Sequence, residues 1–92
     1  MSLRESDFER EVQEWAKTEG GRALKLKMEN ERGFPDRTII LPYGVIAFAE
    51  LKRARGSSKK YEQQKRMVEW LQAMSLPAGF CTTLDGVKDL CR

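Results

Sequence analysis

Two carboxylates and a lysine stand at the ends of two apolar runs: Asp36 precedes RTIIL (37–41), and Glu50 and Lys52 lie at the end of VIAFAEL (45–51). Both runs are rich in β-branched and aromatic residues, which favour strands, and a short Pro-Tyr-Gly segment separates them. Glu50 and Lys52 are two positions apart, so on a strand their side chains share a face. The pattern predicts a hairpin that gathers charged groups at one end.

The Pro-Tyr-Gly turn sets the register of this hairpin. If Gly44 supplies the positive φ of a three-residue loop, Leu41 faces Val45 and Asp36 faces Glu50. Directly opposed residues hold their Cβ atoms roughly 4.5 to 5.5 Å apart, so two like charges placed there repel each other. A one-residue bulge would change this register. We therefore expect a compensating positive charge close to the two carboxylates.

Two converging carboxylates suit a hard divalent cation, because Mg²⁺ prefers oxygen ligands and commonly takes one or two carboxylates together with waters and phosphate oxygens. Such a cation relieves the repulsion, lowers the pKa of water and neutralises charge that develops on a phosphodiester. Lys52 beside two carboxylates stays protonated, so we prefer it as orienter of the water and stabiliser of the phosphorane over a role as general base. Hydrolysis at phosphorus fits these residues.

The composition excludes several other chemistries. The chain has no histidine, which removes Ser-His-Asp triads, Cys-His nucleophiles and His-ligated zinc. Residues 1–92 suffice for a single domain with one modest core, and no apolar run approaches the roughly 20 residues of a membrane span. Cys81 and Cys91 lack metal-ligand spacing and the N-terminal segment is polar, so we expect reduced thiols, a cytoplasmic setting and no membrane contact.

Positive charge is concentrated directly after the second apolar run. The net charge of the chain is only +3, yet between residues 51 and 66 Glu62 is the single acid among many lysines and arginines. Basic residues in this position neutralise phosphates that flank a scissile one, which gives salt-sensitive binding with little sequence information. The candidate DNA-binding residues are Arg53, Arg55, Lys59, Lys60 and Lys65.

The other elements follow from periodicity and turn residues. Apolar residues recur at helical spacing in two long segments, and they alternate with basic residues in ALKLKM as in a half-buried strand. The resulting order αβββαβα indicates an α/β domain with a mixed sheet. The predicted elements are a helix over 6–18, strands over 23–28, 37–41 and 45–51, a helix over 61–74, a strand over 78–84 and a helix over 85–92.

Several large apolar residues have more than one reading. We expect Trp15 in the core, and Tyr61 and Trp70 as packing residues rather than base-stacking platforms. The remaining apolar residues of the C-terminal half either form a dimer face or complete a thin core. They are Phe80, Leu84, Leu90 and the methionines of the second helix.

Taken together, Pro35-Asp36 and Glu50-Leu51-Lys52 resemble the PD-(D/E)XK nuclease signature, and the element order resembles the restriction-endonuclease-like core αβββαβ(α) of that superfamily. The flanking segments ESDFEREV, RGFPDRTIILPYG and AFAELK narrow the resemblance to a stand-alone VRR-NUC domain, the virus-type replication-repair nuclease. The resemblance covers nearly the whole chain. It implies that Asp36 and Glu50 bind Mg²⁺ or Mn²⁺, that the main-chain carbonyl of Leu51 adds a ligand, and that Lys52 assists the water.

The resemblance also implies roles for two residues outside the hairpin. Gln64 resembles the family's active-site glutamine, and Glu9 resembles its first-helix glutamate, with metal contact through a water; Glu5, one turn earlier, is the alternative. Each residue has an ordinary reading too. Acids in the first turns of a helix favour its dipole, and the alternative for Gln64 is an exposed helix residue. The alternative for Asp36 is a turn residue, and for Glu50 with Lys52 a solvated pair.

We therefore expect a metal-dependent, structure-selective DNA endonuclease acting in DNA repair, with water attacking phosphorus and a 3′-hydroxyl leaving. A monomer this small covers few base pairs, so a symmetric pair is better suited to nick two strands. The resemblance implies a homodimeric resolvase of four-way (Holliday) junctions, encoded by a phage or prophage of a bacterial host. Two alternatives are a non-catalytic DNA-binding module and a flap nuclease or exonuclease of the same fold.

Overall fold

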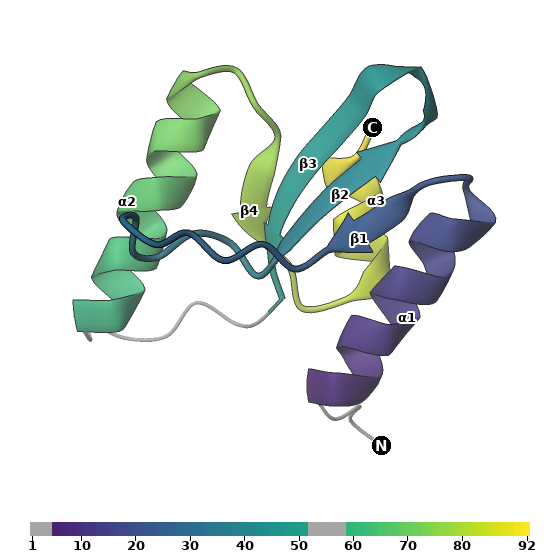
Figure 1. Ribbon diagram of the computed structural model, residues 1–92, viewed down its shortest axis with the longest axis horizontal. Coiled ribbons are helices and arrows are strands. Elements are labelled where there is room, and N and C mark those ends of the chain that lie inside the picture. The colour runs from purple at the N-terminus through teal and green to yellow at the C-terminus, as the bar shows by residue number, and fades with distance from the viewer. Residues whose placement is uncertain (1–4, 52–58) are drawn as a thin grey trace.

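The computed structural model describes residues 5–51 and 59–92. Its order of elements agrees with the α/β class predicted from the sequence (Figure 1). Within the described ranges, no helix is both long and apolar enough to cross a membrane. The elements are α1 (Glu5–Thr18), β1 (Arg22–Leu24), β2 (Arg37–Leu41), the 3₁₀ turn η1 (Pro42–Gly44), β3 (Val45–Glu50), α2 (Lys59–Ala73), β4 (Ala78–Phe80) and α3 (Leu84–Leu90).

The four strands form one mixed sheet between two helical layers. They lie side by side in the order β1-β2-β3-β4, with the first three antiparallel and β4 parallel to β3. A parallel pair needs a crossover connection, and α2 provides it between β3 and β4. In Figure 1, α2 lies on one side of the sheet and α1 on the other. This is the arrangement expected for a restriction-endonuclease-like core.

Alternation along the strands sends side chains into two separate cores. Ile39 and Ala49 belong to the larger core, which α1 and α3 cover, and Phe48 belongs to the smaller core under α2. Because side chains two apart on a strand share a face, Glu50 lies on the same side of the sheet as Phe48. The charged end of the hairpin therefore faces α2.

The hairpin has the register that its turn predicted. The ladder runs from Leu41 opposite Val45 to Arg37 opposite Ala49, without a bulge. Gly44 has the expected positive φ of 75°. Tyr43 also has a positive φ, 67°, so the turn uses two successive left-handed residues where the sequence suggested one. Continuation of the register by one step brings Asp36 opposite Glu50.

The strand predicted over 23–28 is shorter than its alternating pattern suggested. β1 ends at Leu24, which pairs with Thr38, and residues 25–28 are exposed and outside the sheet. The partner strand β2 itself begins only at Arg37, and Pro35, two residues earlier, has no N–H to donate to a neighbouring strand. No ladder is available beyond that point. The chain after β1 instead crosses in front of the strands toward α2 before it returns to β2 (Figure 1).

The last strand is also shorter than predicted, because a helix cap interrupts it. β4 covers Ala78–Phe80, whereas the sequence suggested 78–84. Thr83 is the N-cap of α3, and its Oγ1 accepts a hydrogen bond from the N–H of Gly86 at 3.0 Å. The hydroxyl residues after the strand thus begin the closing helix.

The ambiguous apolar residues divide between core and surface. Trp15, Leu84 and Leu90 pack against the larger core, and Phe80 packs against the smaller one. Tyr61 contacts Phe80, with ring centroids 5.9 Å apart. The expectation that Trp70 is a packing residue is wrong, because 56% of its surface is exposed. Met74, in the turn directly after the same helix, is 52% exposed.

Candidate active site at the end of the hairpin

Asp36 and Glu50 are joined by reciprocal contacts between side chain and backbone. The N–H of Asp36 donates to Glu50 Oε2 at 3.2 Å, and the N–H of Leu51 donates to Asp36 Oδ2 at the same distance. Each carboxylate therefore accepts a hydrogen bond from the other strand. These bonds hold the two acidic side chains at adjacent positions where the regular ladder ends.

Gln64 of α2 closes the site from the helical side. Its Nε2 donates to Glu50 Oε1 at 2.9 Å, and the side chain is buried. Gln64, Val68 and Leu71 form the buried stripe of α2, so the packing of this helix on the sheet positions the amide. The structure thus brings together three residues that the sequence singled out, one from each of three segments.

The burial of Glu50 means that its negative charge must be compensated within the site. Glu50 is 0% exposed, whereas Asp36 is half-buried. A buried carboxylate is costly unless hydrogen bonds and a positive charge compensate, and both oxygens of Glu50 accept such bonds. Each carboxylate oxygen has two lone pairs, so a carboxylate that accepts hydrogen bonds is also able to coordinate a cation.

The oxygen atoms at this position fit a hard divalent cation. Within the described residues, Oδ1 of Asp36 accepts no hydrogen bond, and the carbonyl of Leu51 follows directly after Glu50 in the chain. Carboxylate and carbonyl oxygens are the ligand types that Mg²⁺ and Mn²⁺ take. Asp36, Glu50 and the Leu51 carbonyl would hold the metal.

Glu9 does not join this pair in a cluster of acids. Among residues 5–51 and 59–92, no three His, Cys, Asp or Glu side chains lie close enough together to hold a metal ion. Oε2 of Glu9 instead lies 3.8 Å from Nη2 of Arg37. Arg37 points to the α1 side of the sheet, opposite to Asp36, because the two are neighbours on the strand. Glu5 lies at the start of α1.

Arg37 is a buried cation that the sequence reading overlooked. Its side chain is 8% exposed, and α1 supplies its partners: Glu9, and Gln13 one turn later. With the Gln13 amide oriented so that its oxygen faces Arg37, that oxygen accepts from Nη1 and Nη2 at 2.9 and 3.0 Å. An arginine at the start of an apolar strand, on the face of Ile39, was the signal for such a contact.

The basic residues lie partly within the described chain. Lys52, Arg53 and Arg55 fall outside the described residues. Lys59, Lys60 and Lys65 are exposed in the first two turns of α2, on the helix that also carries Gln64.

Comparison with known proteins supports one family. No protein-family model and no curated protein matches the sequence. A solved structure described as a VRR_NUC domain matches it at 28% identity, over 94% of this chain and 91% of that chain, with a TM-score of 0.76. This match supports the identification of the chain as a stand-alone VRR-NUC domain. The chain has a restriction-endonuclease-like fold, and its similarity to that VRR_NUC domain supports a nuclease-type function with DNA as the substrate class.

Proposed function

We propose that this VRR-NUC domain is a Mg²⁺- or Mn²⁺-dependent endonuclease that hydrolyses phosphodiester bonds of branched DNA, acting as a homodimer on four-way junctions. The contact among Asp36, Glu50 and Gln64 carries the proposal. Two carboxylates at the end of one hairpin and a buried amide against them form a site for a cation beside a phosphate. A phage or prophage origin and a cytoplasmic setting complete the proposal.

Each residue of the site has a role that follows from the chemistry of its side chain. When bound, the metal would supply Lewis acidity and offset the negative charge of the phosphodiester. Asp36 and Glu50 would hold it together with the Leu51 carbonyl, and Gln64 fixes the orientation of Glu50 through its amide N–H. Lys52 orients the attacking water and stabilises the charge that develops on phosphorus. The 3′ oxygen leaves and takes up a proton.

The remaining residues position the catalytic groups or the DNA, rather than acting on the phosphodiester bond that is cut. Glu9 would act through its contact with Arg37, the residue that follows Asp36 in the chain. Any contact of Glu9 with the metal would be made through a water. The basic group neutralises phosphates on either side of the scissile one, so affinity falls steeply with salt. This group comprises Arg53, Arg55, Lys59, Lys60 and Lys65.

The test is cleavage of four DNAs by the wild-type protein and Glu50→Gln: an end-labelled four-way junction, a flap, a linear duplex and a closed circle. Each is incubated with Mg²⁺, Mn²⁺ or EDTA. We expect paired, symmetric nicks on the junction that require metal and vanish in Glu50→Gln. Binding without cleavage under every metal would favour the non-catalytic module. Digestion of linear DNA with an intact circle would favour an exonuclease.

A further inference from the structure

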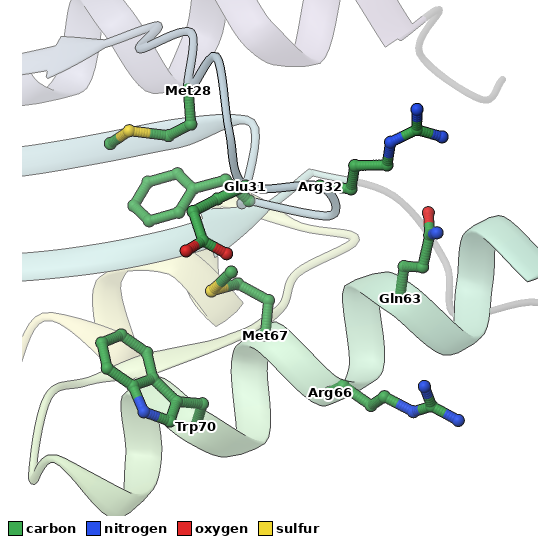
Figure 2. A pocket seen from close by; sticks show the side chains of 8 residues that line it. Met28, Glu31, Arg32, Gln63, Arg66, Met67 and Trp70 are labelled. Atoms are coloured by element: carbon green, nitrogen blue, oxygen red, sulfur yellow. The ribbon is translucent and has the colours of Figure 1, made fainter.

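A hollow of about 590 Å³ opens between α2 and the segment that precedes β2 (Figure 2). We call it the Trp70 hollow. Its walls include the sequence neighbours of two site residues, since Phe34 lies two positions before Asp36 and Gln63 precedes Gln64. The lining residues are Met28, Glu31, Arg32, Phe34, Gln63, Arg66, Met67 and Trp70.

The two ends of the Trp70 hollow differ in chemistry. Figure 2 shows Arg32, Gln63 and Arg66 extending to one side, and Met67 and Trp70 at the other. The helix wall is a single stripe, because these α2 residues recur at intervals of three and four. One end is therefore basic and the other apolar.

The apolar end exposes surface that a folded domain ordinarily covers. Trp70 is 56% exposed and Met28 is 41% exposed. Contiguous exposed apolar surface marks a place where something binds. The volume lies within the roughly 300 to 1,000 Å³ of sites for small planar or drug-sized groups.

Gly33 ties the hollow rigidly to the catalytic side of the domain. It has a φ of +80°, and a Cβ added there would lie 2.6 Å from the backbone carbon and oxygen of Gln63 and 2.8 Å from the nitrogen of Gln64. The preceding segment thus packs directly on the helix backbone at the residue that binds Glu50. Phe34 packs edge-on against Phe48, with ring centroids 5.5 Å apart. The segment before β2 and the backbone of α2 therefore meet at a point that borders both the Trp70 hollow and the Asp36–Glu50–Gln64 contact.

We propose that the Trp70 hollow takes a single unpaired nucleotide of the DNA substrate, next to the phosphate that is cut. The base stacks on Trp70 among the methionines, because every base has an apolar face that an aromatic ring accepts. The flanking phosphates lie against Arg32 and Arg66. The inference rests on the proposed nuclease function and adds that the branched substrate presents one unpaired nucleotide, either already unpaired in the DNA or released from the stack at the branch.

Glu31 fixes which way round the nucleotide sits. Its carboxylate turns toward Met67 at the apolar end, away from the two arginine head groups (Figure 2). A carboxylate repels phosphate but accepts hydrogen bonds from the amino groups of a base edge. In a base pair, the amino group on that edge already donates a hydrogen bond to the partner base. A paired base would have to leave the stack at a cost, whereas an unpaired one enters freely.

The test is a double-mutant cycle between Trp70 and the base, measured as Kd by fluorescence anisotropy in EDTA. One three-way DNA carries an unpaired nucleotide at its branch, and its twin carries an abasic nucleotide there with the same phosphates. The proteins are wild type, Trp70→Ala, Trp70→Phe and Met74→Ala, the last at an exposed residue that follows directly after α2 and lies outside the hollow. Circular dichroism confirms that each variant is folded.

For wild type, we expect loss of the base to raise Kd about 5- to 150-fold, the range of one base stacked on an aromatic ring. In Trp70→Ala, Kd for the unpaired-base DNA should rise by the same factor as removal of the base raises it in wild type. Trp70→Ala should then bind the abasic twin with the same Kd as the unpaired-base DNA. Trp70→Phe and Met74→Ala should bind as wild type does. Additive losses, or an unchanged Kd for Trp70→Ala, would overturn the proposal.

Two further results separate the alternatives. If sedimentation shows that Trp70→Ala converts a dimer to a monomer and weakens all DNAs alike, the hollow is covered by a second copy of the chain, which overturns the base site. If the cycle behaves as expected but no metal supports cleavage, the nuclease proposal fails while the nucleotide site stands. Metal-dependent cleavage with no coupling between Trp70 and the base overturns the nucleotide site alone.

Discussion

The backbone N–H of Asp36 donates to Oε2 of Glu50 across the open end of the hairpin, at 3.2 Å. This contact ends the β2 ladder, since the N–H that would pair with another strand is used by a side chain. It also holds two carboxylates together, and no third acid completes a cluster with them within residues 5–51 and 59–92. The same bond therefore limits the sheet and forms the candidate metal site.

Gln64 should control the orientation and the charge of Glu50. Gln64→Met removes the amide donor that lies 2.9 Å from Oε1, and we expect about a 10- to 100-fold loss of cleavage rate, as for the loss of other outer partners of metal ligands. Gln64→Glu places a second carboxylate there. Because like charges disfavour ionisation, the pKa of the pair rises and the acidic limb of the rate profile moves to higher pH. A pH–rate profile with no shift in Gln64→Glu alone would contradict this contact.

Gly33 and Gly44 form a matched pair for testing the junction under the helix. Both have a positive φ, but a Cβ at Gly44 meets nothing within 4 Å, whereas at Gly33 it meets the backbone of α2. Gly44→Ala should lower the free energy of unfolding by about 1 to 2 kcal/mol, the cost of the left-handed conformation. Gly33→Ala should cost about 1 to 3 kcal/mol more, through overpacking, and should also slow cleavage. Urea unfolding measures both; equal losses would contradict the close approach.

Arg37 should contribute strongly to stability through α1. Removal of one partner of a buried ion pair costs about 3 to 5 kcal/mol. Because Glu9 is 22% exposed, we expect Arg37→Met to reach at most the lower end of that range. Adding Glu9→Gln should restore part of the loss. Arg10→Ala is the control, since the Arg10–Asp7 pair is exposed and should change stability by less than about 1 kcal/mol. An Arg37→Met protein as stable as Arg10→Ala would rule out this role.

The sequence predicted the hairpin more completely than it predicted the contacts and surfaces around the hairpin. The turn residues and the two apolar runs predicted the Leu41–Val45 register, and with it the meeting of Asp36 and Glu50. The buried contact of Arg37 was not predicted, because its partners lie on α1, far away in the sequence. Trp70 was misjudged because helical spacing does not tell which apolar stripe of α2 faces the sheet. Both depend on tertiary packing, which periodicity alone does not determine.

Stability should fall in alkaline solution because of Cys81. Burial, and then the neighbouring Cys91, raises the pKa of the Cys81 thiol from 9.0 to about 11. Between these values the unfolded chain releases a proton that the folded chain keeps, so the free energy of unfolding decreases as pH rises, by at most about 1.4 kcal/mol per pH unit.

Urea unfolding of wild type and Cys81→Ala at pH 8 and pH 10.5 measures this effect. The difference between the two pH values should be smaller in Cys81→Ala, since every other titrating group is common to both proteins. Parallel losses in the two proteins would show that Cys81 does not retain its proton in the folded state.

The most direct measurement of the central claim is a titration of Mn²⁺ into wild type, Asp36→Asn and Asp85→Asn, with the free ion followed by electron paramagnetic resonance. Asp85 is exposed in α3 and serves as the matched control. The paired carboxylates predict Mn²⁺ binding in wild type and in Asp85→Asn, weakened at least about 10-fold in Asp36→Asn. Equal Mn²⁺ binding in Asp36→Asn and wild type would contradict a metal site at the end of the hairpin.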